Sequence, residues 1–327
     1  MTGSSTSGVG AGRRVLAAAS AGGHFKQLVR LVDRLPVVDE VIWLTYDSGL
    51  SHDLLAAAGR EEDRLVHAPY AAPRDLLNLA RNARVARRLL REYDVDLAVS
   101  TGAGIAVAVL PLARAKGVRA AFIESATRAQ GPSLSGRILQ RVPGVELYSQ
   151  NPGYGGRWRD AGSVHDEFEP GTARPITRLS RVVVSLGTIR PYGFRRLLEQ
   201  LVRILPSDAH VLWQTGATDT SGLSIEARET VPGPELEAAI GQADVVVAHA
   251  GTGTALTAFE LGRCPVLVPR RAAADEHVDD HQAVTAQALA GRQLAVHAEV
   301  DDLSTELLLA AARRSVIRRD MVPDLQI

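Results

Sequence analysis

Short apolar runs alternate with amphipathic helical patterns along most of the chain. In the first half, strands are predicted at residues 15–19, 41–45, 97–100 and 119–123, with a helix at 105–116. In the second half, strands are predicted at 182–186, 211–214, 245–248 and 266–268, and helices at 194–205, 234–243, 255–261 and 280–290. This alternation is typical of the α/β class, in which helices cover both faces of a doubly wound parallel sheet.

The alternation breaks once, at residues 167–180, which hold two prolines and a glycine but no apolar periodicity. We predict a linker there. The predicted organisation is a disordered Gly/Ser/Thr-rich tail at 1–12, a Rossmann-like domain at 13–166, and a second Rossmann-like domain at 181–327. Sheets of this kind bind ligands beyond the carboxyl ends of their strands, so the loops after the strands are where chemistry is expected.

Composition narrows the class of protein. The 327 residues suffice for two domains, and 46% hydrophobic with 23% charged residues favours a globular protein. Basic and acidic residues balance at 37 each, which argues against a nucleic-acid partner. A single cysteine, Cys264, excludes an intrachain disulfide, and with no secretory signal we expect a cytoplasmic protein. The longest uncharged stretch, 97–113, is short for a membrane-spanning helix.

The loop after the first predicted strand reads Ser-Ala-Gly-Gly-His over residues 20–24. Its glycines allow close backbone approach, and the free N–H groups of the following helix suit an anion. His24 stands at the mouth of this loop, where a general base could act. The alternative is a tight strand-to-helix turn with a surface histidine.

The segment 244–269 is the richest in candidate chemistry. A buried strand runs into His-Ala-Gly-Thr-Gly-Thr at 249–254, and the next helix carries Glu260. The glycines would let the backbone approach a diphosphate, and the threonines and helix dipole would favour its charge. Glu260 could accept hydrogen bonds from a ribose diol. The alternative is a Gly-rich turn with a capping threonine and a solvated glutamate.

Residues 270–282 place paired carboxylates beside histidines, but the spacing matches no zinc pattern, and no metal is expected. A loop that contacts sugar hydroxyls through Asp, His and Gln fits better. The alternative is a charged loop that caps the next helix through Asp279 or Asp280. Gly187 and Thr188, which follow another strand, could also meet phosphates.

One predicted helix has a basic face. Its opposite stripe is formed by Leu76, Leu79, Ala83, Ala86 and Leu90. Such a helix can lie against anionic lipid, although a merely solvated face is equally compatible with the pattern. The basic residues, spaced to share one face, are Arg74, Arg81, Arg84, Arg88 and Arg91.

These motifs together resemble a known family. Segments 249–260, 269–271 and 276–282 resemble the C-terminal domain of family 28 glycosyltransferases. Segments 20–24, 100–102 and 123–128 resemble the partner subunit of the bacterial exopolysaccharide glucuronosyltransferase pair, so the resemblance implies both subunits fused in one chain. The pair is related to the N-acetylglucosaminyltransferase that makes lipid II.

The resemblance implies a GT-B fold, in which two Rossmann-like domains face a cleft. It implies an inverting transfer from a UDP-sugar, without metal or other cofactor, to a polyprenyl-diphosphate-linked sugar. The implied donor-binding residues are Gly187, Thr188, His249, Gly251, Thr252, Gly253, Thr254, Glu260, Arg270, Arg271, Asp280, His281 and Gln282. The implied acceptor-binding residues are Gly22, Gly23, Thr101, Gly102, Ser125 and Arg128, with His24 and Glu124 as candidates for the catalytic base.

The adjacent Arg270 and Arg271 favour glucuronic acid as the donor sugar, because a guanidinium binds a carboxylate with two parallel hydrogen bonds. Alternatively, one arginine pairs with Asp275 or Glu276 and the other is solvated. The main hypothesis is therefore glucuronosyl transfer to a lipid-linked sugar in exopolysaccharide assembly.

Other functions stay open on the sequence. They are N-acetylglucosamine transfer, transfer to a small natural-product acceptor, UDP-sugar epimerisation, and non-catalytic nucleotide binding. The apolar anchor that often begins the acceptor-side subunit is missing from the polar residues 1–14. Membrane contact at the inner face would then be peripheral, through the basic face, or the acceptor would be soluble.

Overall fold

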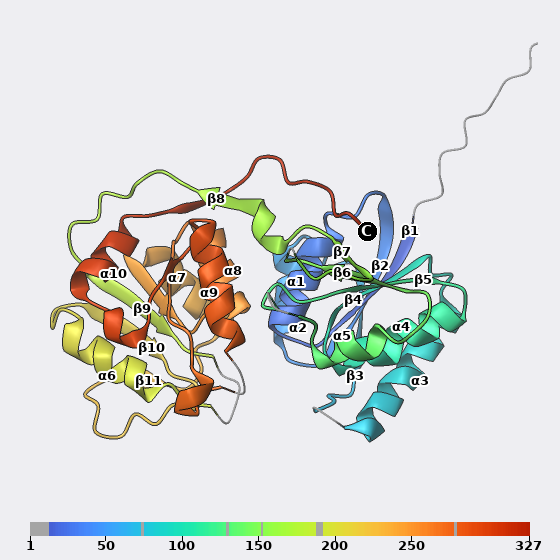
Figure 1. The fold of residues 1–327 in the computed structure, drawn as a ribbon, viewed down its shortest axis with the longest axis horizontal. Coiled ribbons are helices and arrows are strands. Elements are labelled where there is room, and N and C mark those ends of the chain that lie inside the picture. Colours follow the sequence, from blue (N-terminus) through green and yellow to red (C-terminus); the bar gives the residue numbers. More distant parts are fainter. Residues whose placement is uncertain (1–12, 73–74, 129–130, 152, 188–191, 278–279) are drawn as a thin grey trace, which may run out of the picture.

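The computed structural model describes residues 13–72, 75–128, 131–151, 153–187, 192–277 and 280–327. Figure 1 shows two α/β domains lying side by side, each a parallel sheet with helices on both faces. The N-terminal sheet has seven strands in the order β3-β2-β1-β4-β5-β6-β7, and the C-terminal sheet has six in the order β11-β10-β9-β12-β13-β14. The predicted doubly wound α/β fold is confirmed.

In the N-terminal domain, every described strand pairing is parallel. The strands are β1 (Arg13–Ala19), β2 (Val38–Tyr46), β3 (Arg64–Ala68), β4 (Leu97–Gly102), β5 (Arg119–Ile123), β6 (Val145–Ser149) and β7 (Trp158–Asp160). The helices are α1 (Gly23–Val32), α2 (Leu50–Ala57), α3 (Leu76–Glu92), α4 (Gly104–Ala115) and α5 (Leu134–Leu139). Strand order reverses between β1 and β4, so the loops after these two strands open the crevice where such sheets bind ligands.

The C-terminal domain repeats the arrangement, with its order reversing between β9 and β12. Its strands are β9 (Arg181–Ser185), β10 (His210–Gln214), β11 (Ala227–Arg228), β12 (Val245–Ala248), β13 (Val266–Leu267) and β14 (Val296–His297). Its helices are α6 (Arg195–Ile204), α7 (Gly233–Gln242), α8 (Thr252–Glu260), α9 (His281–Gly291) and α10 (Thr305–Ala312). The Gly/Thr-rich loop therefore leaves the sheet at its switch point.

The segment predicted as a linker is not free of secondary structure. It contains β8 (Phe168–Pro170), which pairs antiparallel with β15 (Val316–Arg318) from the far end of the chain. The chain then returns to the N-terminal domain, where the Leu325 amide donates to the Arg34 carbonyl at 2.8 Å and the Leu325 side chain is buried. Figure 1 shows this C-terminal end lying over the N-terminal domain. Two crossings therefore tie the domains together.

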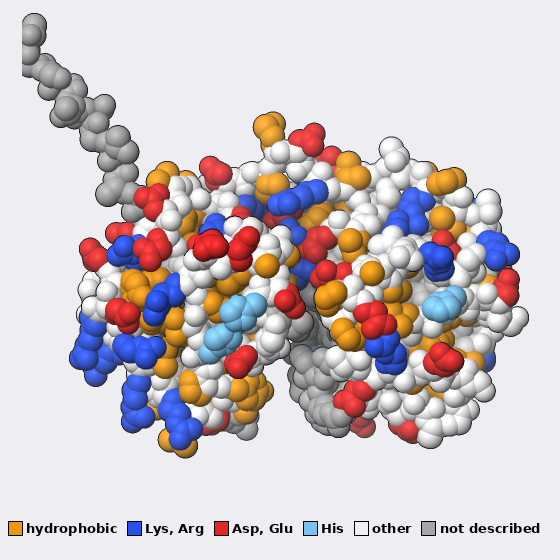
Figure 2. Space-filling model, turned by 180° about the vertical axis from the view of Figure 1, so that it is seen from behind, with side chains coloured by type: hydrophobic (Ala, Val, Ile, Leu, Met, Phe, Trp, Pro, Cys, Tyr) orange, Lys and Arg blue, Asp and Glu red, His pale blue; other side chains and the backbone are white. Residues whose placement is uncertain are grey.

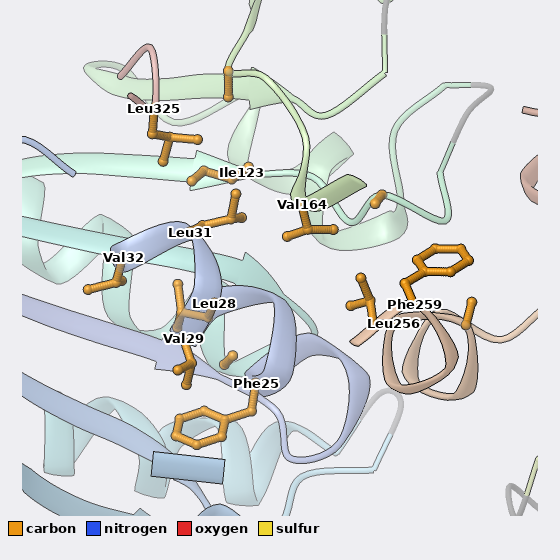
Figure 3. Close-up of a cluster of buried hydrophobic side chains, with 14 of the residues drawn as sticks. Phe25, Leu28, Val29, Leu31, Val32, Ile123, Val164, Leu256, Phe259 and Leu325 are labelled. Atoms are coloured by element: carbon orange, nitrogen blue, oxygen red, sulfur yellow. The ribbon is translucent and has the colours of Figure 1, made fainter. Parts of the chain in front are cut away.

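One hydrophobic cluster spans both domains. It includes the buried face of α1, one face of the N-terminal sheet, and Leu256 and Phe259 of α8. Figure 3 shows Leu256 and Phe259 beside Val164, with Phe25 and Leu28 of α1 nearby. Apolar burial is the main stabilising contribution to a fold, so this shared cluster favours a fixed approach of α8 to α1. That approach brings the loop after β1 and the loop after β12 together.

The basic helix forms as α3, but its apolar stripe differs from the prediction. Leu76 is 74% exposed, whereas Leu89 is buried together with Asn82, Ala86 and Leu90. The Leu79 side chain lies 3.7 Å from where a Cβ on Gly104 would stand, so the helix contacts the start of α4. None of the helices in the described part of the chain is both long enough and apolar enough to cross a membrane. Arg74 lies outside the described residues.

Candidate active site

The loop between β1 and α1 places His24 against the end of β4. The His24 Nδ1 lies 2.9 Å from the Thr101 carbonyl oxygen, and the Thr101 hydroxyl donates to the His24 carbonyl at 2.7 Å. Gly22 has φ +79°, and Gly102 has φ +131° with the His24 ring only 3.1 Å from where a Cβ would stand. Any side chain at residue 102 would displace the imidazole. The predicted grouping of Gly22, His24, Thr101 and Gly102 is therefore present.

This environment suits His24 to accept a proton. A carbonyl oxygen only accepts hydrogen bonds, so Nδ1 carries the hydrogen and the lone pair is on Nε2. Burial lowers the pKa of His24, and the positive charge of Arg128 lowers it further, against the opposing effect of the Thr101 carbonyl. A neutral imidazole with a defined tautomer is the state that a general base needs.

Glu124, the other candidate base, has a different environment. Its side chain is buried, and its oxygens accept from the amides of Ser125 at 3.1 Å and Ser133 at 2.8 Å. Burial raises the pKa of Glu124, although these amides oppose the shift. The carboxylate thus holds the turn before α5 in place, and the geometry favours His24 as the base.

Gln27 organises the acceptor-side loop, and sequence reasoning missed it. Its buried amide oxygen accepts from the Ala126 amide at 2.9 Å and the Gln150 side chain at 3.0 Å. Its nitrogen donates to the Ser125 hydroxyl at 3.1 Å. A glutamine among the apolar positions of α1 was the only available signal. Since Gln27 lies one turn after His24, α1 positions both His24 and the loop that carries Ser125 and Arg128.

In the C-terminal domain, the two predicted phosphate-loop glycines surround a histidine. The His249 Nε2 would lie 2.6 Å from a Cβ at residue 187 and would also collide with one at residue 251. The His249 Nδ1 lies 3.3 Å from the Ser185 carbonyl. Gly187 and Gly251 are therefore required by the packing of this ring, a constraint that the sequence pattern did not reveal.

The start of α8 has groups that could bind an anion. The Thr252 side chain is 5% exposed, and its hydroxyl has no hydrogen-bond partner among the residues that the structure describes. The first amides of a helix lack intrahelical partners and carry a partial positive charge. A buried hydroxyl without a partner is unfavourable, so a bound oxyanion would satisfy it. Thr254 is less available, because its hydroxyl lies 3.3 Å from that of Ser185.

The loop that leads from β1 to His24 and the Gly/Thr-rich loop at residues 249–254 face each other across the domain boundary. A Cβ on Gly23 would lie 4.0 Å from the Gly253 amide nitrogen, and nothing within 4 Å would meet a Cβ on Gly253 itself. The residue after Gly23 is His24, and the residue before Gly253 is Thr252. His24 and the start of α8 thus lie close to each other.

Arg270 lies three residues after β13 and is 2% exposed. Its guanidinium reaches the Gly187 carbonyl at 3.4 Å, and its amide donates to the Gln282 side chain at 3.0 Å. It forms no ion pair with any described residue, and its Nε has no partner among them. Burial lowers the pKa of Arg270. A buried, unpaired guanidinium beside Gly187 would be stabilised by an anionic ligand.

The described charged side chains that follow Arg270 largely bond to other groups of the protein. Arg271 pairs with Glu299. The Glu276 carboxylate accepts hydrogen bonds from two guanidinium nitrogens of Arg196, at 2.8 and 3.0 Å. Neither Arg270 nor Arg271 forms a side-chain ion pair with Glu276 among the described residues. Asp280 accepts from the Ala272 amide at 3.0 Å and does not cap α9 with its side chain. Thr188 and the side chain of His281 lie outside the described part of the chain.

Both carboxylate oxygens of Glu260 have partners in this structure. Its oxygens accept from Lys26 at 2.8 Å and from Arg30, both on α1 of the other domain. In the described residues, no group of three or more His, Cys, Asp and Glu side chains could hold a metal.

Residues 182–319 match the glycosyltransferase family 28 C-terminal domain. The match covers most of the C-terminal domain. Over the longer span, the chain is 25% identical to the UDP-N-acetylglucosamine–N-acetylmuramyl-(pentapeptide) pyrophosphoryl-undecaprenol N-acetylglucosamine transferase of Synechococcus sp. (strain CC9902). The alignment covers 84% of this chain and 81% of that protein, so the glycosyltransferase relationship extends into the N-terminal domain.

Solved structures agree on the fold. The crystal structure of Acinetobacter baumannii MurG has a TM-score of 0.56 at 18% identity, covering 91% of this chain and 89% of that one. A UDP-N-acetylglucosamine 2-epimerase has a TM-score of 0.58 at 10% identity, covering 92% and 86%. The predicted GT-B fold is confirmed, and the chain is a glycosyltransferase. At these identities, the structural likeness by itself does not separate transfer from epimerisation.

Proposed function

We propose that this glycosyltransferase moves a sugar from a UDP-sugar to a polyprenyl-diphosphate-linked sugar. The observation that carries the proposal is the meeting of the His24 loop with the start of α8, which pairs a proton acceptor with an anion site. The relative from Synechococcus is named for transfer from a UDP-sugar to a pyrophosphoryl-undecaprenol acceptor, which supports the same substrate classes.

The arrangement supports a single displacement with inversion. The His24 Nε2 takes the proton of the acceptor hydroxyl while that oxygen bonds to the anomeric carbon of the donor sugar. The bond from this carbon to the diphosphate oxygen breaks, and the electron pair leaves with UDP. The amides at the start of α8, the Thr252 hydroxyl and Arg270 would stabilise the negative charge that develops on the diphosphate. No metal or other cofactor enters this scheme.

For the donor sugar we propose glucuronic acid, on the strength of Arg270. Arg271 is occupied by Glu299, so Arg270 alone of the two supports this assignment. A buried guanidinium without an ion-pair partner among the described residues matches a planar carboxylate. The second candidate is N-acetylglucosamine, which the relative's name favours. In that case Arg270 would act on the diphosphate alone.

The experiment follows UDP release from UDP-glucuronic acid, UDP-N-acetylglucosamine and UDP-glucose, with and without polyprenyl-diphosphate-linked sugars. Transfer that requires the lipid-linked acceptor is expected. Turnover of the nucleotide sugar without acceptor would instead favour an epimerase, and UDP binding without any turnover would favour a non-catalytic module. Transfer only to small acceptors would favour natural-product glycosylation.

Arg270→Ala and its neighbour Arg271→Ala form a matched pair for the donor sugar. If the uronate is the ligand, Arg270→Ala should lose about tenfold or more of the preference for UDP-glucuronic acid over UDP-glucose, and Arg271→Ala should retain it. An equal loss of affinity for all three donors would assign Arg270 to the diphosphate and remove the support for glucuronic acid.

We further propose that α3 contacts the inner face of the membrane, where exopolysaccharide assembly would supply the acceptor. Arg84, Arg87, Arg88 and Arg91 line a hollow on its surface, and Leu76 and Leu77 are exposed on its first turn. Figure 2 shows basic side chains gathered along the edge of the N-terminal domain that lies far from the C-terminal domain. Arginines near anionic lipid contribute about 1 kcal/mol each, and exposed leucines can enter the interface.

Sedimentation with phosphatidylglycerol vesicles tests this contact. Replacing Arg84 and Arg88 by Gln should weaken binding by about tenfold or more at low salt. The matched control replaces Arg195 and Arg203, two arginines on α6 of the other domain, and should leave binding unchanged. Equal binding of all variants would exclude α3 as the contact.

A further inference from the structure

Two cations of α1 hold the carboxylate that is expected to bind the donor ribose. Lys26 donates to the Glu260 Oε2 at 2.8 Å and to the Thr257 hydroxyl at 2.8 Å. Arg30 donates to the Glu260 Oε1. Each oxygen of the Glu260 carboxylate is thus bonded to a charged donor, and both donors come from the other domain. We name the contacts of Lys26 and Arg30 with Glu260 the interdomain latch.

The latch is built so that it can open. Arg30 also donates to Glu167 at 2.5 Å, and the Glu167 side chain is 1% exposed. If Glu260 turned away, Arg30 would keep a buried carboxylate partner, and Lys26 would keep the Thr257 hydroxyl. Opening therefore leaves Arg30 ion-paired and Lys26 hydrogen-bonded, which limits the cost of breaking the two contacts with Glu260.

Glu260 is also accessible enough to exchange partners. Its side chain is 24% exposed, compared with 12% for Lys26 and 16% for Arg30. Because the Glu260 carboxylate is the most exposed of the three groups, hydroxyl donors on a tightly bound nucleotide could reach it and replace these partners. A ribose diol would use both carboxylate oxygens, and these are the two atoms that the latch occupies.

We propose that the nucleotide of the donor competes with Lys26 and Arg30 for Glu260, so that donor binding opens the interdomain latch. This inference rests on the proposed function, in which Glu260 binds the ribose. Lys26 and Arg30 lie on the helix that begins with the His24 loop, and Glu260 lies on the helix that begins with the Thr252 anion site. Donor binding is thereby coupled to the contact between the base-carrying and donor-binding domains.

The competition predicts that removing the latch tightens nucleotide binding. Calorimetric titration with UDP at low ionic strength compares wild type with Lys26→Met and Arg30→Met, which keep side-chain length but remove the charge. Each variant should bind UDP about two- to fivefold more tightly than wild type, which is what the loss of one partly exposed ion pair permits. In a Glu260→Ala background, which itself should bind UDP at least several-fold more weakly, Lys26→Met should have no further effect.

Arg292→Met is the matched control. Arg292 also forms an interdomain ion pair, with Asp166 at 2.5 Å, but it does not contact Glu260. Its UDP affinity should equal that of wild type, which separates competition at Glu260 from general loosening of the two domains. Lys26→Met provides an independent test if Arg30→Met, which also loses the Glu167 contact, does not fold.

The outcomes separate this inference from the function on which it rests. UDP binding that is unchanged or weaker in Lys26→Met would overturn the latch and leave the donor site intact. Tighter binding in Arg292→Met as well would equally overturn it. Absence of UDP binding in wild type and every variant would contradict the proposed function, and the latch with it.

Discussion

The hydrogen bond from His24 to the Thr101 carbonyl decides which ring nitrogen can accept a proton. The backbone carbonyl cannot donate, so it fixes the tautomer, and burial keeps the ring neutral. Glu124 shows the opposite case, because backbone amides occupy its carboxylate inside the protein. At the scale of single residues, burial and one or two hydrogen bonds therefore distinguish a candidate base from a structural acid.

For His24 we predict a pH profile. Because burial lowers the pKa of His24, the neutral form persists to lower pH than for a free histidine, so kcat/KM should rise on an acid limb whose midpoint lies below about 6.5. His24→Ala should reduce turnover by about 10²- to 10⁴-fold and largely retain UDP affinity. The control is His52→Ala, an exposed histidine on α2, which should keep both. Near-normal turnover of His24→Ala would transfer the role to another residue.

At the scale of a single element, the start of α8 combines the unpaired amides of a helix with side chains that could bind an anion. A helix offers unpaired amides at its first turn whatever its sequence, but the neighbouring residues decide whether a ligand can use them. Here Thr252 adds a buried hydroxyl without a partner among the described residues, and Gly253 leaves space beside the loop of the other domain. The element therefore holds local instability that a bound anion would relieve.

Thr252→Val should change stability and binding in opposite directions. Valine has nearly the same shape and removes an unsatisfied buried hydroxyl, so the unliganded melting temperature should stay level or rise. UDP affinity should fall by about 1 kcal/mol, since one hydrogen bond to the diphosphate is lost. Thermal melting with and without UDP measures both effects. Thr45→Val is the matched control: Thr45 is also buried without a partner in the described structure, but it lies on β2, and its replacement should not affect UDP.

Catalysis is expected to proceed without a divalent metal. In the proposed scheme the departing diphosphate is stabilised by amides at the start of α8 and by Arg270, which are fixed parts of the protein. Sugar transfer assayed in excess EDTA should therefore keep its rate. A loss of activity that Mg²⁺ or Mn²⁺ restores would refute this scheme.

At the scale of the whole molecule, the contact between the domains is both apolar and charged. The shared hydrophobic cluster brings α1 to α8, and β8 with β15 connects the two crossings of the chain. His165, in the 3₁₀ helix Val164–Glu167 just before β8, packs edge-on against Phe259 of α8 at 6.3 Å between ring centroids. A titratable group therefore lies buried between the domains.

His165 makes stability depend on pH. Burial lowers the pKa of His165 to about 4, while an unfolded histidine titrates near its ordinary value of about 6.5. Between these values the unfolded chain binds the extra proton, so the free energy of unfolding should fall as pH falls from about 6.5 to about 4, by up to about 1.4 kcal/mol per pH unit.

His165→Gln should flatten this dependence in urea denaturation measured across that pH range. Part of the slope should persist, because the pKa of His24 is lowered as well. The control is His210→Gln, an exposed histidine on β10, which should leave the slope unchanged. A slope that is identical in wild type and His165→Gln would show that His165 does not titrate in this window.

The sequence by itself determined the class of fold and the positions of the Gly-rich loops that follow its strands. Strands predicted at 119–123 and 245–248 coincide with β5 and β12, because continuous apolar runs in a doubly covered sheet are local signals. The Gly-rich loops could be located because glycine and hydroxyl residues directly follow such strands. The short strands β8 and β15 escaped prediction, since three residues are too few to carry a periodic pattern and β8 also ends in a proline.

Only the tertiary structure decided which groups each of the candidate site residues contacts. Glu124 is buried on backbone amides, Gly187 makes room for His249, Arg271 pairs with Glu299, and Glu260 is held by Lys26 and Arg30 of the other domain. Apart from the adjacent Ser125 amide beside Glu124, these partners stand between 9 and more than 200 positions apart in the chain. Periodicity reports on neighbours within a turn or a strand, whereas burial and charge pairing depend on elements that meet only after the domains have packed.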